Sequence, residues 1–200
     1  SDPKEAESFA LIAEADNGSS FYQFLQECQL PKDLSLRRSE TEPWFVEYER
    51  RRVLSDIDEV EFLTGDFGNC VANPGPFSGE VDSFDLGSTA FQSQAVFDRI
   101  SEYRRHIKDL SGIRVYRDGF AIRVDQDWLK LGAQWTSAPS YYGLKPDNTL
   151  GYIALSARDN IELEEKTDRE GFKDSPYYRN FYLLLTEFKN FTTTAHNFFG

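Results

Sequence analysis

The chain has 200 residues, of which 22 are Lys or Arg and 34 are Asp or Glu, so its formal net charge is −12 at pH 7. That length fits one domain with a sizeable core, and the negative charge argues against nonspecific binding to nucleic acid, which requires neutralisation of phosphates. No stretch reaches the roughly 20 apolar residues that span a bilayer and no apolar leader opens the chain, so we expect a cytoplasmic protein without a membrane segment.

Helix-forming residues dominate the first segment, residues 4–16, and Asn17-Gly18 would end a helix there. Ser19-Ser20 can cap a second helix. Apolar residues recur in that second segment at helical spacing, at Phe21, Phe24, Leu25 and Cys28. The pattern predicts a small helical hairpin.

Residues 31–56 combine arginines with aromatic residues. Such a cluster can bind nucleic acid, or it can be an amphipathic helix whose arginines pair with nearby glutamates; the acidic surroundings favour the helix. The glutamates concerned are Glu40, Glu42, Glu47 and Glu49. We therefore divide the chain into an N-terminal helical segment, residues 1–56, and an α+β domain, residues 57–200.

Short extended segments separated by Gly, Asn and Pro follow at residues 60–63, 67–72 and 77–84, and they predict strands of an antiparallel or mixed sheet. A helix is expected over residues 88–110, because one apolar stripe runs along it. The stripe consists of Val96, Ile100, Tyr103, Ile107 and Leu110.

Asp118-Gly119 lies between two alternating runs, residues 113–117 and 120–124, which is a strong hairpin signal. We expect Ile113, Val115 and the rings beyond the turn to face the core. The arginines of the hairpin, Arg114, Arg117 and Arg123, are expected outside.

Residues 125–149 form a long aromatic connection, and connections of that length are usually functional or disordered. A further strand is predicted at residues 150–156 and a final helix at residues 176–197, and we expect both helices to pack on one face of the sheet. The apolar side of the final helix carries Phe181, Leu184, Leu185, Phe188 and Phe191.

The chain contains no self-contained catalytic or metal-binding motif. Its two histidines, His106 and His196, are far apart in the sequence, and Cys28 and Cys70 lack the spacing of a metal site, so none is expected. Without a secretory signal we expect both cysteines to be reduced thiols. Neighbouring carboxylates such as Glu164-Glu165 are common on surfaces and are not assigned a catalytic role.

Three segments, residues 75–80, 111–120 and 150–171, together resemble the transducer, or middle, domain of bacterial GHKL-type ATPases, the superfamily of gyrase, a heat-shock chaperone, histidine kinases and MutL. The most specific parts are Tyr-Arg-Asp-Gly-Phe, residues 116–120, and Lys-Thr-Asp-Arg-Glu-Gly, residues 166–171. The resemblance covers about residues 74–195. The connection after the hairpin departs from the family pattern at Lys130. The resemblance therefore assigns no specific role to this connection.

The resemblance implies a ribosomal-protein-type βαβ transducer domain that follows a nucleotide-binding domain. That neighbouring domain, absent from this chain, would bind ATP and Mg, so the chain is not expected to be an active ATPase alone. Lys166 and Arg169 are implied to contact the γ-phosphate, with Thr167 beside them. The ends of the chain, Ser1 without a methionine and an apolar run before Gly200, also predict a fragment of a longer protein, which could be a homodimer.

Two other interpretations stay open at this point. Lys166 and Arg169 could form an exposed charged turn, paired with Glu164, Glu165, Asp168 and Glu170, and Thr167 could cap the following helix rather than touch phosphate. The chain could also be a non-catalytic protein-interaction module that uses the aromatic loop at residues 128–142, because Trp and Tyr are enriched at interfaces.

Overall fold

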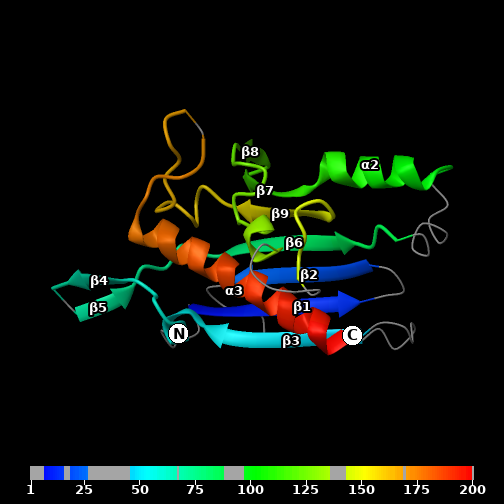
Figure 1. Ribbon diagram of the computed structural model, residues 1–200. Coiled ribbons are helices and arrows are strands. Elements are labelled where there is room, and N and C mark those ends of the chain that lie inside the picture. The colour runs from blue at the N-terminus through cyan, green and yellow to red at the C-terminus, as the bar shows by residue number, and fades with distance from the viewer. Residues whose placement is uncertain are drawn as a thin grey trace.

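The structure is a computed structural model that describes residues 7–15, 19–26, 46–66, 68–87, 97–135, 143–168 and 170–199. Within these ranges, seven strands form one mixed sheet, and two more strands form a separate ribbon that projects from the body (Figure 1). One long helix runs diagonally across a face of the sheet (Figure 1). The expected α+β class, with a mixed sheet and helices, is confirmed.

The large sheet has the spatial order β3-β1-β2-β6-β9-β7-β8, and every neighbouring pair is antiparallel except β7 and β9. Its strands are β3 (Val46–Val53), β1 (Ser8–Ala15), β2 (Ser19–Gln26), β6 (Phe77–Phe84), β9 (Thr149–Leu155), β7 (Gly112–Arg117) and β8 (Phe120–Ile122). The ribbon consists of β4 (Phe62–Gly65) and β5 (Gly68–Val71). The helices are α2 (Ile100–Leu110) and α3 (Pro176–Phe199), with 3-10 turns η2 (Leu54–Asp56) and η3 (Gly132–Trp135).

The predicted N-terminal helical hairpin is wrong, because its two segments are the antiparallel strands β1 and β2. In β1 the residues that face α3 and those that face away are both buried, so the segment is a short continuous apolar run. Such a run cannot be distinguished from a buried helix by its pattern, and tertiary packing overrides the helix propensity of its Ala and Glu residues. Residues 16–18 and Cys28 lie outside the described residues.

The amphipathic helix expected within residues 31–56 is also wrong for its described part, residues 46–56. That part is edge strand β3 followed by η2. Arg52 reaches across to pair with Glu187 of α3. Because β2 pairs with β6, residues 19–26 and 77–84 belong to one sheet across the expected boundary at residue 56.

The strands expected after residue 57 and the Asp118-Gly119 hairpin are confirmed. Asp118 and Gly119 have φ values of 49° and 83°, the left-handed pair that a tight hairpin turn needs. Helix α2 begins at Ile100 rather than at residue 88; residues 88–96 lie outside the described residues. None of the helices among the described residues is both long and apolar enough to cross a membrane.

The core lies between the sheet and α3. The predicted apolar side of α3 is confirmed, since all five of its residues are at most 1% exposed. Phe181 packs its ring against Phe77 of β6 and Phe172, with centroid distances of 4.9 and 5.9 Å. Phe188 makes a similar contact, at 5.9 Å, with Phe24 of β2. The last helix is therefore joined to strands from the first half of the chain.

Two predictions for the hairpin are wrong. Phe120 was expected in the core, but its side chain is 78% exposed at the edge of the sheet. Arg117 was expected outside, but it is half-buried, because it shares the inner face of β7 with Ile113 and Val115.

Truncating Phe181 to Ala should lower the free energy of unfolding by about 3–5 kcal/mol, because the change leaves a cavity among buried rings. Phe120→Ala removes the same atoms from an exposed site and should change it by less than about 0.5 kcal/mol. Urea unfolding followed by circular dichroism measures both variants. Equal losses for the two would contradict the assignment of the core.

His196 near the end of α3 is partly buried, and its Nδ1 accepts the Gly143 N–H at 2.9 Å, so the ring is neutral there. Burial lowers the pKa of His196, with the positive charge of Lys145 adding to the effect. The unfolded chain therefore takes up this proton first as pH falls below about 6.5, and the folded state loses stability from there downward.

As the pH falls below 7, we expect the free energy of unfolding to decrease more steeply for the wild type than for the variant His196→Asn. The Asn amide oxygen can still accept the Gly143 N–H. Urea titrations at a series of pH values measure the difference. Parallel curves for the two proteins would show that His196 does not titrate in this way.

Candidate functional site

The loop between β9 and α3 carries the residues that the sequence singles out. It closes on itself through two backbone hydrogen bonds, from the Lys166 N–H to the Gly171 carbonyl at 3.0 Å and from the Lys173 N–H to the Glu164 carbonyl at 2.8 Å. Gly171 has a φ of 84°, which favours glycine at this return of the chain. The loop therefore has a defined backbone in which Lys166 is exposed.

Arg117 joins this loop to the sheet. Its guanidinium donates to the Leu163 carbonyl, pairs with the Glu165 carboxylate at 3.1 Å, and lies 5.7 Å from the centre of the Phe172 ring. These three partners precede, adjoin and follow Lys166. A charged hydrogen-bond donor of this kind contributes more than a neutral one, and its partly buried position limits screening by water.

The carboxylates beside Lys166 have other partners. Glu164 pairs with Lys173 at 2.5 Å, and this hydrogen bond lowers the pKa of Glu164. Glu165 pairs with Arg117, and Asp168 accepts the Glu170 N–H at 3.0 Å. Among the residues that the structure describes, no carboxylate lies within ion-pair distance of the Lys166 ammonium.

A hollow of about 450 Å3 opens beside Lys166, between the loop and the residues that follow β8. An isolated backbone β-bridge between residues Arg123 and Glu170 joins these two segments. The polar part of the lining consists of Arg123, Asp125, Lys166 and Glu170, and its aromatic part of Trp128, Phe172 and Tyr178. The two cations can approach an anion such as phosphate, whereas the two carboxylates restrict where it can sit.

The other predicted site residues have different outcomes. Arg169 lies outside the described residues. Thr167 is exposed in a turn, and the expectation that it caps the following helix is wrong, because α3 begins nine residues later at Pro176. Ser175 is the cap: its Oγ accepts the Tyr178 N–H at 3.1 Å, and Pro176 occupies the first helical position.

The described part of the aromatic loop is packed against the body. The Trp128 indole N–H donates to the Ile113 carbonyl at 2.8 Å, and its ring stacks on Phe181 with a centroid distance of 6.5 Å. Leu129 and Leu131 are buried. Residues 136–142 lie outside the described residues, so the interaction module proposed for residues 128–142 stays a prediction.

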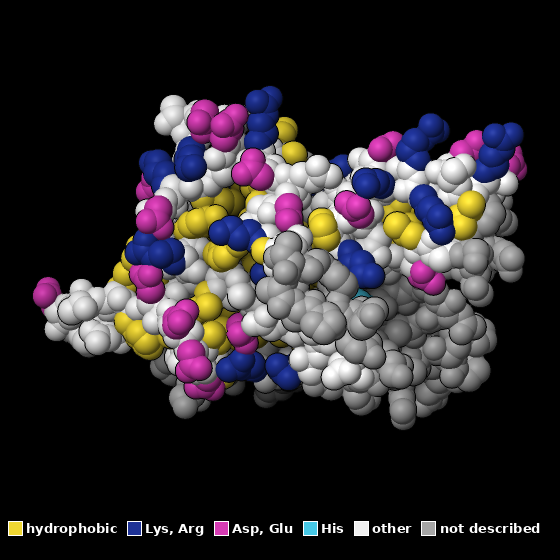
Figure 2. Space-filling view, in the orientation of Figure 1, with side chains coloured by type: hydrophobic (Ala, Val, Ile, Leu, Met, Phe, Trp, Pro, Cys, Tyr) yellow, Lys and Arg dark blue, Asp and Glu magenta, His cyan; other side chains and the backbone are white. Residues whose placement is uncertain are grey.

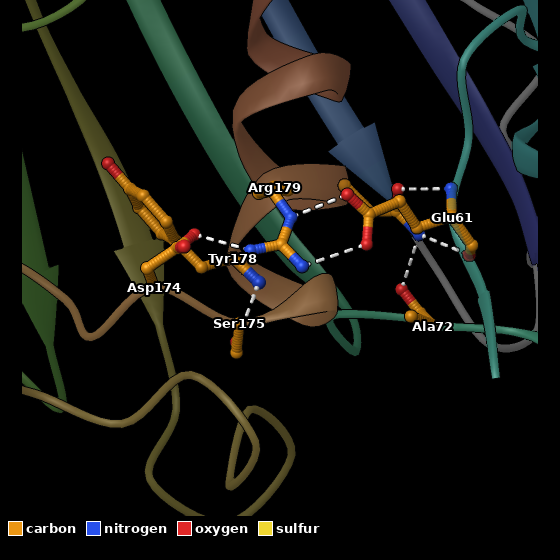
Figure 3. Close-up of polar contacts among 7 residues, drawn as sticks. Glu61, Ala72, Asp174, Ser175, Tyr178 and Arg179 are labelled. Atoms are coloured by element: carbon orange, nitrogen blue, oxygen red, sulfur yellow. Dashed lines mark hydrogen bonds and ion pairs between the residues drawn. The ribbon is translucent and has the colours of Figure 1, made fainter.

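A second, larger hollow of about 640 Å3 lies along the first half of α3 and shares Trp128 and Tyr178 with the first. At its rim, Arg179 binds both carboxylate oxygens of Glu61, at 2.5 and 3.0 Å, and Asp174 at 2.7 Å (Figure 3). The hydrogen bond from Arg179 lowers the pKa of Glu61. Hydrophobic side chains gather on this side of the molecule, among charges of both signs (Figure 2).

The described residues include no group of three His, Cys, Asp or Glu side chains that could hold a metal ion. The Cys70 thiol is free and exposed on β5.

Comparison of the chain with protein-family models, with curated proteins and with solved structures found no match.

Sequence reasoning missed the contacts of Arg117 with the loop and the left-handed residues on the rim of the larger hollow. Arg117 could have been found, because it continues the alternation of Ile113 and Val115 and must share their face. Glu59 and Lys130 lie on the rim of the larger hollow and have left-handed backbone conformations that no local sequence motif predicts.

Replacing Arg117 with Gln should loosen the loop, because Glu165 and the Leu163 carbonyl lose a charged donor worth about 1.5–3 kcal/mol. We expect the Lys166 and Lys173 amides to exchange with solvent hydrogen roughly ten- to a hundredfold faster, while the amides of α3 are unchanged. Amide hydrogen exchange measures this directly. Arg114→Gln, on the exposed face of the same strand, is the matched control, and an equal effect of both changes would argue against the anchoring role.

Proposed function

We propose that this chain is the transducer domain of a larger GHKL-type ATP-binding protein, and that its residues 163–173 form a loop that presents Lys166 to the γ-phosphate of ATP. The ATP and its Mg would be bound by a neighbouring nucleotide-binding domain of the same protein. The chain order β6, α2, β7, β8, β9 and α3 combines strands of one mixed sheet with two helices, and this supports the α+β class that the proposal requires.

One observation carries the proposal. An exposed charged turn would pair Lys166 with the carboxylates around it, yet Glu164, Glu165 and Asp168 have other partners. Glu170 lines the same hollow, but among the described residues no carboxylate lies within ion-pair distance of the Lys166 ammonium. The backbone of the loop is held by its own hydrogen bonds and by Arg117. A cation that no described carboxylate pairs directly is suited to an anion that comes from elsewhere.

The mechanism follows from where charge develops. Hydrolysis of ATP places charge on the oxygens of the transferred phosphoryl group, and a cation fixed in advance stabilises that charge without reorganisation. The same contact exists only while the γ-phosphate is present. Its loss after hydrolysis would release the loop, so nucleotide state would be converted into a movement of this domain.

Lys166→Ala in the full-length protein should lower ATP turnover about a hundredfold, the usual cost of removing one stabilising donor from a transition state. The double variant Lys166→Ala/Arg169→Ala should lose at least as much. Steady-state ATP hydrolysis measures turnover, and thermal melts of the same samples report whether the fold is kept.

Lys173→Ala is the matched control, because Lys173 is a lysine of the same loop whose charge is already paired with Glu164. It should leave turnover within about twofold of wild type. Wild-type turnover in the Lys166 variant, or an equal loss in both single variants, would remove the proposed role of the loop.

A further inference from the structure

The larger hollow, along the first half of α3, has no part in the phosphate contact proposed above. Its volume of about 640 Å3 is within the range of sites that bind small molecules. It is formed by three segments that are distant in the sequence: the turn before β4, the connection at residues 128–130, and α3. Such convergence makes it a preformed cleft between elements of the fold.

The wall of this hollow offers apolar surface, and the polar groups of Tyr182 and Asn180 are already bonded within the protein. Trp128, Tyr178, Tyr182 and Leu183 supply rings and an aliphatic side chain. The Tyr182 hydroxyl donates to the Trp128 carbonyl at 3.3 Å, and burial raises the pKa of Tyr182. Asn180 is likewise engaged, since it exchanges hydrogen bonds with the backbone of Glu61 and donates to the Ala72 carbonyl. An aromatic or aliphatic group is the natural occupant of such a wall.

Two of the four charged residues on the rim pair with each other, and the other two have no ion-pair partner among the described residues. Arg179 and Glu61 form the two-point pair seen in Figure 3. Glu59 and Lys130 are exposed, and the described residues give neither of them an ion-pair partner. The hollow therefore presents one free carboxylate and one free ammonium, and they come from different segments.

The backbone at these two positions is strained. Glu59 and Lys130 have φ values of 69° and 53°, and among the described residues Asp118 is the third non-glycine residue with positive φ. Asp118 sits in the hairpin turn and accepts the Ala157 N–H. Glu59 lies inside the turn that the Val60 N–H closes on the Ile57 carbonyl at 3.4 Å, and the Lys130 N–H closes a turn on the Asp127 carbonyl at 2.8 Å. Glu and Lys have none of the local side-chain hydrogen bonds that make this conformation acceptable to Asp and Asn. Left-handed backbone at non-glycine residues is common at binding sites, and both of these residues line the same hollow.

We propose that this hollow binds a small zwitterion with an apolar body, namely a free amino acid with an aromatic or branched aliphatic side chain, or a dipeptide of such residues. The ligand carboxylate pairs with Lys130, its ammonium pairs with Glu59, and its side chain lies against Trp128 and Tyr178. A ligand with one charge would leave the opposite rim charge desolvated beside it without a partner, which costs affinity.

Isothermal titration calorimetry on the 200-residue chain tests this with L-phenylalanine, L-leucine and the dipeptide Leu-Phe, and with N-acetyl-L-phenylalanine amide as the uncharged probe. We expect saturable binding of at least one zwitterion and none of the uncharged probe. The comparison of amino acids with the dipeptide identifies which of the two sources fits.

Glu59→Asn and Lys130→Asn should each weaken binding tenfold or more. Asn adopts the left-handed conformation readily, so the melting temperature should stay the same or rise. Asp118→Asn is the matched control, since it is the same kind of change at the third left-handed position, away from the hollow, and it should leave binding unchanged.

Three results would overturn the proposal: no binding of any zwitterion at millimolar concentration, equal binding of the uncharged probe, or wild-type affinity in both Asn variants. Loss of ATP turnover in the Lys166 variants is a separate matter, because Lys166 does not line this hollow.

Discussion

The contact between the apolar side of α3 and the inner face of the sheet is the constraint on which the rest of the structure depends. Phe181 and Phe188 meet rings from β6 and β2, so one helix closes the core over strands that are central to the sheet. The same helix fixes the surface features. Its first turn holds Glu61 through Arg179, and its side chains Tyr178 and Tyr182 form the wall of the larger hollow.

Arg117 makes the second important contact, because its side chain links strand β7 of the sheet to a loop whose described residues contain no helix or long strand. Its guanidinium contacts residues before and after Lys166, so the position of the lysine depends on the hairpin as well as on the loop. The two hollows then share a boundary, because Trp128 and Tyr178 line both. A ligand that moves either ring in one hollow would also change the shape of the other.

The sequence predicted the second half of the fold well and the first half poorly, for physical reasons. Asp118-Gly119 favours a tight hairpin turn, and the spacing of Phe and Leu in residues 176–197 fits an amphipathic helix. Residues 9–13 are buried on both faces, so their apolar run carries no period that separates strand from helix. The candidate site was predicted only in part: Lys166 was chosen by resemblance, whereas the hollow beside the turn at Glu59 depends on distant segments that only the folded chain brings together.

The order of the strands has a consequence for how the protein is made. Strand β9 inserts between β6 and β7, and α3 follows every strand of the sheet, so the sheet is neither continuous nor covered until residues 149–199 exist. Chains leave the ribosome from the N-terminus, and contacts between distant segments form slowly. During synthesis the apolar faces of β1, β2 and β6 therefore remain exposed until α3 has been made. The nascent chain is exposed to aggregation throughout that interval, and it is most in need of a chaperone before residue 176 emerges.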